Sequence, residues 1–194
     1  MYKYGKCLIP ISILFLVALD QLSKYIIQSN LEIGQTAFML KGGFGIKYVV
    51  NRGMPLGLFK EFEYINLLGT IFCSTAIPLI SLLYRYYIHK FHRSKWLVAA
   101  LVFVIGGAIG NLLDRIIFGY SRDFLVWPGP GTPNLADLFI DIGVAMFVIE
   151  LFKNPKIKFN LKLRPIKREI QGIKEFLIFS RNELMRLFKI SPKG

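Results

Sequence analysis

Two aspartates, Asp123 and Asp137, are fourteen positions apart and have no close basic neighbour in the sequence except Arg122. Where two carboxyl groups lie a few ångströms apart, both cannot ionise at low cost, so one pKa rises and the groups can share a proton. One carboxylate can then activate a water molecule as a general base, while the other group donates a hydrogen bond to the carbonyl under attack. If the chain brings these side chains together, they predict the chemistry of an aspartic peptidase.

Other types of catalysis find little support in the sequence. Both histidines, His89 and His92, fall in one basic segment, and the Ser and His residues are not arranged as a catalytic triad. Cys7 and Cys73 lie far apart within apolar stretches, so we expect neither a disulfide framework nor a zinc site, and no cofactor. A structural role is the alternative for Asp137, because the dipole at a helix N-terminus stabilises a carboxylate by about 0.3–1 kcal/mol.

Several other charged and polar residues lie within apolar stretches, where a charge costs roughly 3 kcal/mol and so indicates a function or an internal ion pair. Asp20 and Lys24 are four residues apart and can pair on one face of a helix. Asn111, Asp114 and Arg115 share a helical face for the same reason. For the pairs Asp20–Lys24 and Asp114–Arg115, a functional role and a purely structural ion pair are both open.

The elements that position these residues are predicted to be membrane-spanning helices. The chain has 194 residues, 54% of them hydrophobic, with 25 Lys and Arg against 12 Asp and Glu, which is typical of a membrane protein with basic edges. Four stretches are long and apolar enough to cross a bilayer, at residues 7–27, 62–84, 96–118 and 135–151. The first is not expected to be a cleaved signal peptide, because it continues through Asp20 and Lys24 without a small-residue cleavage site.

The distribution of Lys and Arg predicts how these helices are oriented. Residues 85–96 carry four basic residues and no acidic one, and the segment from residue 152 onward carries twelve basic and three acidic residues. By the positive-inside rule, both segments and the N-terminus face the cytoplasm, so we expect a multi-pass protein of the cytoplasmic membrane. Because topology explains the basic surplus, we expect no nucleic-acid partner.

The two remaining links, residues 28–61 and 119–134, then face outward. The first contains short β-type runs and predicts a small strand or hairpin element, whereas the second is rich in Pro and Gly and predicts turns. The outer halves or ends of the spans carry the polar residues Asp20, Lys24, Asn111, Asp114, Arg115 and Asp137. Because Asp123 lies in the second outer link, the sequence predicts one polar site at the outer membrane boundary.

The segment after residue 152 divides into two parts. Lys and apolar residues alternate over residues 156–163, as in a β-strand. From Pro165 onward, apolar residues recur at helical spacings opposite Lys and Arg, namely Ile166, Ile170, Ile173, Leu177, Leu184 and Phe188. We expect a basic amphipathic helix on the anionic inner leaflet, which makes phospholipid a partner, with a solvated or partly disordered tail as the alternative.

Five short motifs resemble, in order, those of the lipoprotein signal peptidases, or signal peptidase II, a family of membrane aspartic peptidases. They are DQLSK at residues 20–24, NRGMPLG at 51–57, GGAIGNLLDR at 106–115, RDF at 122–124 and NLAD at 134–137. The resemblance implies an all-α bundle of four transmembrane helices with a small extramembrane β-cradle at residues 28–61. This peptidase domain would occupy residues 1–152, followed by a basic cytoplasmic extension at residues 153–194.

The resemblance also implies a reaction and the residues that perform it. The family cleaves prolipoproteins before a diacylglyceryl-modified cysteine in the outer leaflet of the cytoplasmic membrane. Its catalytic pair corresponds to Asp123 and Asp137, with Asp114 as the second choice for this pair. Substrate-binding or supporting roles fall on Asp20, Lys24, Asn51, Gly53, Gly107, Asn111, Asp114, Arg115, Asn134 and Ala136. No metal is implied, and four spans that enclose a site need no second chain, so we expect a monomer.

This chain departs from the family pattern at several positions. Arg122 replaces an apolar residue beside Asp123, where a cation would lower the pKa of that carboxyl group unless it points away. Met54 and Pro55 interrupt a segment that normally has small residues. A catalytically inactive membrane-binding module, or an ion pathway with paired structural aspartates, is therefore the alternative to an active peptidase.

Overall fold

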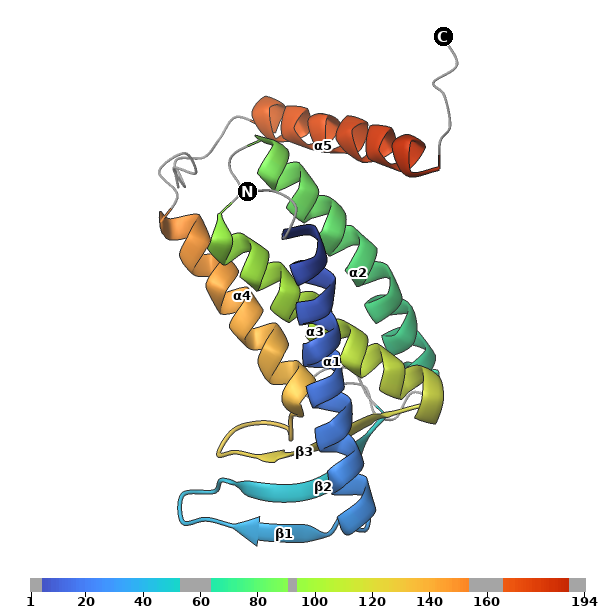
Figure 1. The fold of residues 1–194 in the computed structure, drawn as a ribbon, viewed down its shortest axis with the longest axis vertical. Helices are drawn as coiled ribbons and strands as arrows, with labels where there is room; N and C mark the ends of the chain where they lie inside the picture. Colours follow the sequence, from blue (N-terminus) through green and yellow to red (C-terminus); the bar gives the residue numbers. More distant parts are fainter. Residues whose placement is uncertain (1–4, 53–63, 91–93, 154–165, 189–194) are drawn as a thin grey trace.

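The computed structural model describes residues 5–52, 64–90, 94–153 and 166–188, and it consists of long helices with a small sheet at one end (Figure 1). The elements in chain order are α1 (Gly5–Asn30), β1 (Thr36–Met39), β2 (Gly45–Asn51), α2 (Ile65–Lys90), α3 (Lys95–Phe118), β3 (Ser121–Val126), α4 (Leu135–Lys153) and α5 (Ile166–Leu187). Gly53, Met54, Pro55 and the strand expected at residues 156–163 lie outside the described residues.

Three helices of the described chain are long and apolar enough to cross a membrane, which confirms three of the predicted spans. The spanning segments are Leu8–Asn30 in α1, Asn66–His89 in α2 and Lys95–Phe118 in α3. Large apolar side chains such as Leu14 and Phe72 are exposed on these helices, as expected where the surroundings are lipid. α4 is helical over the range predicted for the fourth span, but it carries four charged residues, so its crossing of the membrane stays a prediction.

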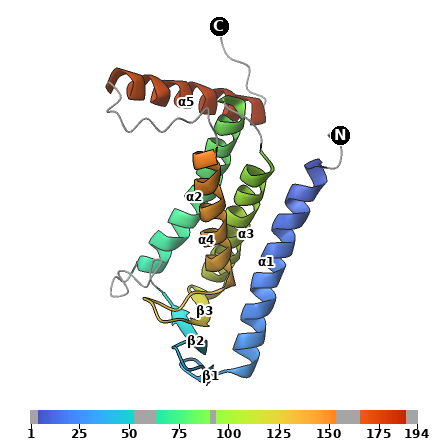
Figure 2. The ribbon, with the colours of Figure 1, turned by 90° about the vertical axis from the view of Figure 1, so that its left-hand side faces the viewer.

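α3 lies at the centre of the bundle and packs against α1, α2 and α4 (Figures 1 and 2). A core cluster of Leu16, Val102 and Phe139 joins α1, α3 and α4. The sheet lies at one end of this bundle, and α5 crosses the opposite end. Residues of α1, α3 and α4 that are far apart in the sequence therefore meet next to the sheet.

The two ends of α3 are fixed by its capping residues. The N–H of Leu97 donates a 3.0 Å hydrogen bond to the side chain of Ser94, which satisfies a donor of the first turn. At the other end, Gly119 adopts a left-handed conformation with φ of 77°, and its N–H donates to the carbonyl oxygen of Arg115. This left-handed cap ends the helix directly before β3.

The sheet has three antiparallel strands in the order β1–β2–β3. β1 and β2 form the hairpin expected from residues 28–61, and β2 also pairs with β3, with Val49 opposite Asp123 and Asn51 opposite Ser121. The prediction that turns dominate residues 119–134 is therefore wrong for the part that forms β3. Its first four side chains are all buried, so the strand lacks the alternation that marks a half-exposed strand, and apart from Gly119 the Pro and Gly residues of this link begin only at Pro128.

Glycines let α3 approach its neighbours closely. A Cβ atom on Gly107 would lie 2.3 Å from the carbonyl oxygen of Ala136 in α4, and one on Gly110 would lie 2.5 Å from Oδ2 of Asp20 in α1. Both distances are too short for real contacts. A larger residue at Gly107 would push α4 away from α3, whereas one at Gly110 would first displace the carboxylate of Asp20. Gly107 thus has a packing role, because its missing side chain sets the separation of α3 and α4.

We expect Gly107→Ala to destabilise the protein by about 1–3 kcal/mol, because the added methyl group meets backbone that cannot move independently of α4. Thermal unfolding of the purified protein in detergent measures this loss. Gly172→Ala in α5 is a matched control, because nothing lies within 4 Å of its added Cβ. Equal unfolding temperatures for the Gly107→Ala variant and the parent protein would contradict the close packing of α3 and α4.

Candidate active site

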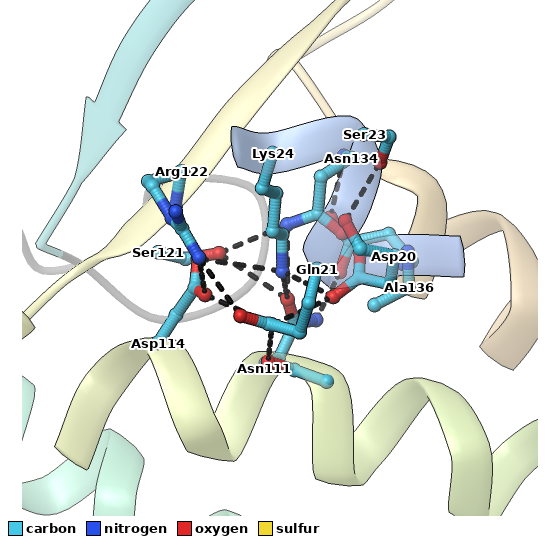
Figure 3. Close-up of polar contacts among 12 residues, drawn as sticks. Asp20, Gln21, Ser23, Lys24, Asn111, Asp114, Ser121, Arg122, Asn134 and Ala136 are labelled. Atoms are coloured by element: carbon cyan, nitrogen blue, oxygen red, sulfur yellow. Dashed lines mark hydrogen bonds and ion pairs between the residues drawn. The ribbon is translucent and has the colours of Figure 1, made fainter. Parts of the chain in front are cut away.

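A cluster of buried polar side chains lies where the sheet meets the helices (Figure 3). Its buried members come from α1, α3, β3 and the residue before α4: Asp20, Lys24, Asn111, Asp114, Ser121, Arg122, Asp123 and Asn134. Asp137, in the first turn of α4, is half-buried. The structure therefore brings together most of the site residues predicted from the sequence.

Lys24 and Arg122 form ion pairs with two carboxylates of this cluster. Lys24 Nζ lies 2.8 Å from Asp20 Oδ2 and 3.4 Å from Asp114 Oδ2. Arg122 Nη2 lies 2.7 Å from Asp114 Oδ1, and the backbone N–H of Arg122 donates to Asp114 Oδ2 at 2.9 Å. Two buried cations therefore face two buried carboxylates, and this group of four residues is neutral, as low-dielectric surroundings require. We call it the ion cluster.

Arg122 points away from its sequence neighbour Asp123. Its Nη1 donates to Gln28 Oε1 at 2.8 Å, and its Nη2 donates to Gln21 Oε1 at 2.9 Å, so it reaches across to α1. Its guanidinium carbon lies 4.3 Å from the centre of the Phe118 ring, within range of a cation–π interaction. The unusual cation is thus held by Asp114 and α1 and does not form an ion pair with Asp123.

The two pairs considered from the sequence have different outcomes. The Asp20–Lys24 ion pair is confirmed. The pairing of Asp114 with Arg115 is wrong, because the carboxylate of Asp114 faces α1 and β3, whereas Arg115 Nη1 donates to Asn66 Oδ1 of α2 at 3.3 Å. Neighbouring residues on a helix point about 100° apart, which is enough to send these two side chains to different neighbours.

Asp123 and Asp137 are linked by Asn134. Asn134 Nδ2 donates to Asp123 Oδ1 at 2.7 Å, and the backbone N–H of Asn134 donates to Asp137 Oδ2 at 3.0 Å. The other oxygen of Asp137 accepts a 2.8 Å hydrogen bond from Asn111 Nδ2. Among the described residues, neither carboxylate has a Lys or Arg within ion-pair distance.

The structural role considered for Asp137 is also present. Asn134 Oδ1 accepts a 3.1 Å hydrogen bond from the backbone N–H of Asp137, while Asp137 Oδ2 accepts from the backbone N–H of Asn134. This reciprocal pair is a capping box at the start of α4. It holds one oxygen of Asp137 in a fixed place.

The surroundings of Asp123 favour its protonated form. Burial, followed by the charge of Asp137, raises the pKa of Asp123 from 3.8 to about 7, although hydrogen bonds from Asn51, Asn134 and Ser121 oppose this rise. The side chain is almost entirely buried, and Ser121 Oγ lies 2.9 Å from its Oδ1. Near neutral pH, Asp123 can therefore hold a proton while it is linked through Asn134 to Asp137.

Two of the remaining predicted residues, Asn51 and Ala136, contact this arrangement. Asn51 lies opposite Ser121 in the sheet, and the buried Ala136 donates its backbone N–H to Asp20 Oδ1 at 2.9 Å. Gly53 cannot be placed, because it lies outside the described residues. Within the part of the chain that the structure describes, no group of three or more His, Cys, Asp or Glu side chains is placed to hold a metal ion.

Three members of the site were not identified from the sequence: Gln21, Gln28 and Ser121. Gln21, Lys24 and Gln28 follow a helical spacing of three and four residues, so this polar stripe could have pointed to Gln21 and Gln28. Ser121 had no such signal, because its position depends on β3. Asp141, one turn after Asp137, is exposed on α4.

The chain is similar to known proteins over most of its length. Residues 12–153 match the family model described as signal peptidase (SPase) II. The lipoprotein signal peptidase of Halothermothrix orenii is 32% identical over 153 residues, with 77% of this chain and 99% of the relative covered. That of Fusobacterium nucleatum is 34% identical over 148 residues, with 74% and 86% covered. A solved bacterial membrane enzyme is 26% identical, with a TM-score of 0.63 and with 84% of this chain and 97% of that chain covered.

Apolar helices around a buried acidic cluster, together with these matches, define a peptidase of the membrane. The chain belongs to the signal peptidase II family. The resemblance carried by the five sequence motifs is thereby confirmed. The family match ends at residue 153, so α5 lies outside it.

Proposed function

We propose that this protein is an aspartic endopeptidase that removes the signal peptide from prolipoproteins by cleaving before a diacylglyceryl-modified cysteine. The observation that carries the aspartic mechanism is the separation of four acids into two groups. Asp20 and Asp114 are neutralised within the ion cluster, whereas Asp123 and Asp137 have no cation in ion-pair distance among the described residues. We therefore assign the shared proton to the second group.

This separation favours Asp123 and Asp137 over Asp114 as the catalytic pair. Both oxygens of Asp114 are occupied by hydrogen bonds and ion pairs with Arg122 and Lys24. A carboxylate held by two cations is a poor proton acceptor, because protonation would leave those cations unpaired. Asp114 instead orients Arg122 and, through it, the strand that carries Asp123.

The two acids have different surroundings, which suggests different roles. Asp123 is buried and its pKa is raised to about 7, so we assign it the shared proton, which it donates to the scissile carbonyl oxygen. Asp137 is half-buried, and we assign it the role of the general base that takes a proton from the attacking water. Asn111 and Asn134 hold the two carboxyl groups in place by the hydrogen bonds described above.

The placement of the site in the membrane is part of this proposal. α4 is taken as the fourth span, with both ends of the chain in the cytoplasm and the sheet at the outer surface, as the positive-inside rule predicts. The acids then lie at the outer membrane boundary, where a lipid-modified substrate and water can both reach them. Prolipoprotein and phospholipid are the partners, and a single chain carries the whole site.

Cleavage of a diacylglyceryl-modified lipobox peptide by the purified protein tests this function. Mass spectrometry of the products should show one cut, directly before the modified cysteine, with the same rate with and without a metal chelator. Absence of cleavage with a correctly folded protein would instead favour the inactive membrane module with structural aspartates. A rate that falls on chelation would contradict the assigned mechanism.

The raised pKa of Asp123 predicts that the peptidase activity declines on the alkaline side of its pH profile, which we call the alkaline limb. As pH rises through about 7, Asp123 loses its proton, so kcat/KM should fall by up to about tenfold per pH unit. Ser121→Ala removes a hydrogen bond that lowers the pKa of Asp123, so the limb should move to higher pH. The pH profiles of the two proteins measure this shift, and a shift to lower pH would contradict the assignment of the proton to Asp123.

A further inference from the structure

α5 crosses the end of the bundle that lies away from the sheet, at a steep angle to the other helices (Figures 1 and 2). Its contacts are with the last turns of α2. Since α2 is apolar enough to span the membrane up to His89, α5 lies beside the end of a span rather than beyond it. This places α5 at the level where hydrocarbon gives way to lipid headgroups.

One side of α5 is occupied by α2. The ring of Tyr86 lies 5.4 Å from the ring of Phe176 and 5.5 Å from that of Phe179, in edge-to-face contacts. Glu183 forms an ion pair with Arg85, also on this side. These contacts fix the rotation of α5 about its own axis.

An adjoining side of α5 is an apolar stripe without a partner among the described residues. It consists of Ile170, Ile173, Leu177, Leu184 and Phe188, whose side chains are between 43% and 71% exposed. Their spacings of three, four and seven residues keep them on one face of the helix. Leu177 points about 200° away from Phe179 and about 100° away from Phe176, so the stripe lies beside the side that contacts α2 and not on it.

The charged residues of α5 are divided between these two sides. Lys174 and Arg181 are exposed, lie two turns apart, and border the apolar stripe. Glu175 and Glu183 lie on the side towards α2, where they face Tyr86 and Arg85. The described side chains next to the stripe are thus basic, and the acidic ones are turned away.

We propose that this face of α5 binds an anionic phospholipid surface, with the apolar stripe inserted among the acyl chains and Lys174 and Arg181 on the headgroup phosphates. An apolar stripe bordered by basic residues is complementary to such a surface, and a helix that crosses the bundle end can lie in the plane of the membrane. The contact is independent of the proposed peptidase activity, because α5 lies outside the family match and on the far side of the bundle from the acids.

Spin labels on the full-length protein in nanodiscs test this contact. With both cysteines replaced by alanine, a label is placed at Leu177→Cys in the stripe or at Arg186→Cys, which is exposed on the other side of α5. In bilayers with phosphatidylglycerol, the label at position 177 should collide mainly with oxygen, which partitions into lipid. The label at position 186 should collide mainly with an aqueous nickel chelate.

The role of the two cations is tested with Lys174→Gln and Arg181→Gln combined. Each basic residue near an anionic surface contributes about 1 kcal/mol to binding. The double substitution should therefore lower the ratio of lipid-bound to free α5 by roughly 30-fold. The same change should follow when phosphatidylglycerol is replaced by phosphatidylcholine, and Arg186→Gln should have little effect. Two results would overturn the proposal. In one, the label at position 177 collides freely with the nickel chelate in phosphatidylglycerol bilayers. In the other, protein shields this label from both oxygen and the chelate.

Discussion

Asp123→Asn and Asp137→Asn should each lower kcat for a lipidated prolipoprotein peptide by about 10²- to 10⁴-fold, the usual contribution of general acid–base groups. Asparagine has the same shape as aspartate but can neither hold the shared proton nor accept one from water. It retains an oxygen that can accept hydrogen bonds, so Asn134 and Asn111 keep acceptors at both positions. Initial rates of cleavage under saturating substrate measure the loss.

Asp141→Asn is the matched control for these variants, because it removes an exposed acid one turn along the same helix from Asp137. It should leave kcat within about twofold of the parent value, since surface changes rarely exceed ±0.5 kcal/mol. Thermal unfolding of all three variants checks that each is folded. Full turnover by a folded Asp123→Asn protein would contradict the assignment of Asp123 and Asp137 as the catalytic pair. It would favour Asp114 as a member of that pair instead.

Lys24→Met should cost about 3–5 kcal/mol of stability, because it leaves buried carboxylates without a cation that they need. Lys24 is completely buried between Asp20 and Asp114, at 2.8 and 3.4 Å. Methionine fills much of the same space, so the lost charge dominates the effect. Unfolding of the purified protein in a detergent titration measures the free-energy change.

A second substitution separates the charge effect from the packing effect. With Lys24→Met and Asp20→Leu combined, Asp114 keeps its ion pair with Arg122 and the group stays neutral. The double variant should therefore be less destabilised than the sum of the two single variants. Lys47→Met, at an exposed position of β2, should change stability by less than about 0.5 kcal/mol. If the losses of stability caused by Lys24→Met and Asp20→Leu were strictly additive, the ion cluster would not act as a unit.

Much of the helical framework and the outline of the site could be predicted from the sequence. Membrane helices are marked by long apolar runs, so the ranges of α1, α3 and α4 matched closely. The alternating direction of the spans then required the acids of several helices to meet at one end. That Lys24, Asn111 and Asp137 converge follows from this argument, and in the structure Asn111 accepts a hydrogen bond from Lys24 and donates one to Asp137.

The parts that escaped prediction depend on contacts between distant segments. β3 has buried side chains on both faces, so its sequence shows no alternation, and only its pairing with β2 defines it. The direction of Arg122 depends on the carboxylate of Asp114 and the amides of Gln21 and Gln28, none of which is adjacent in the sequence. Local patterns cannot specify such partners.

Asn134 joins three elements that are separate in the sequence. It contacts Asp123 of β3, Asp137 of α4 and, through Nδ2 at 2.9 Å, Asn111 of α3. A newly made chain whose helices are not yet packed lacks these bonds, so nothing then holds Asp123 and Asp137 beside Asn134. If these two acids are the catalytic pair proposed above, activity requires α3, β3 and α4 to be docked together, so an incompletely assembled molecule should not cleave its substrate.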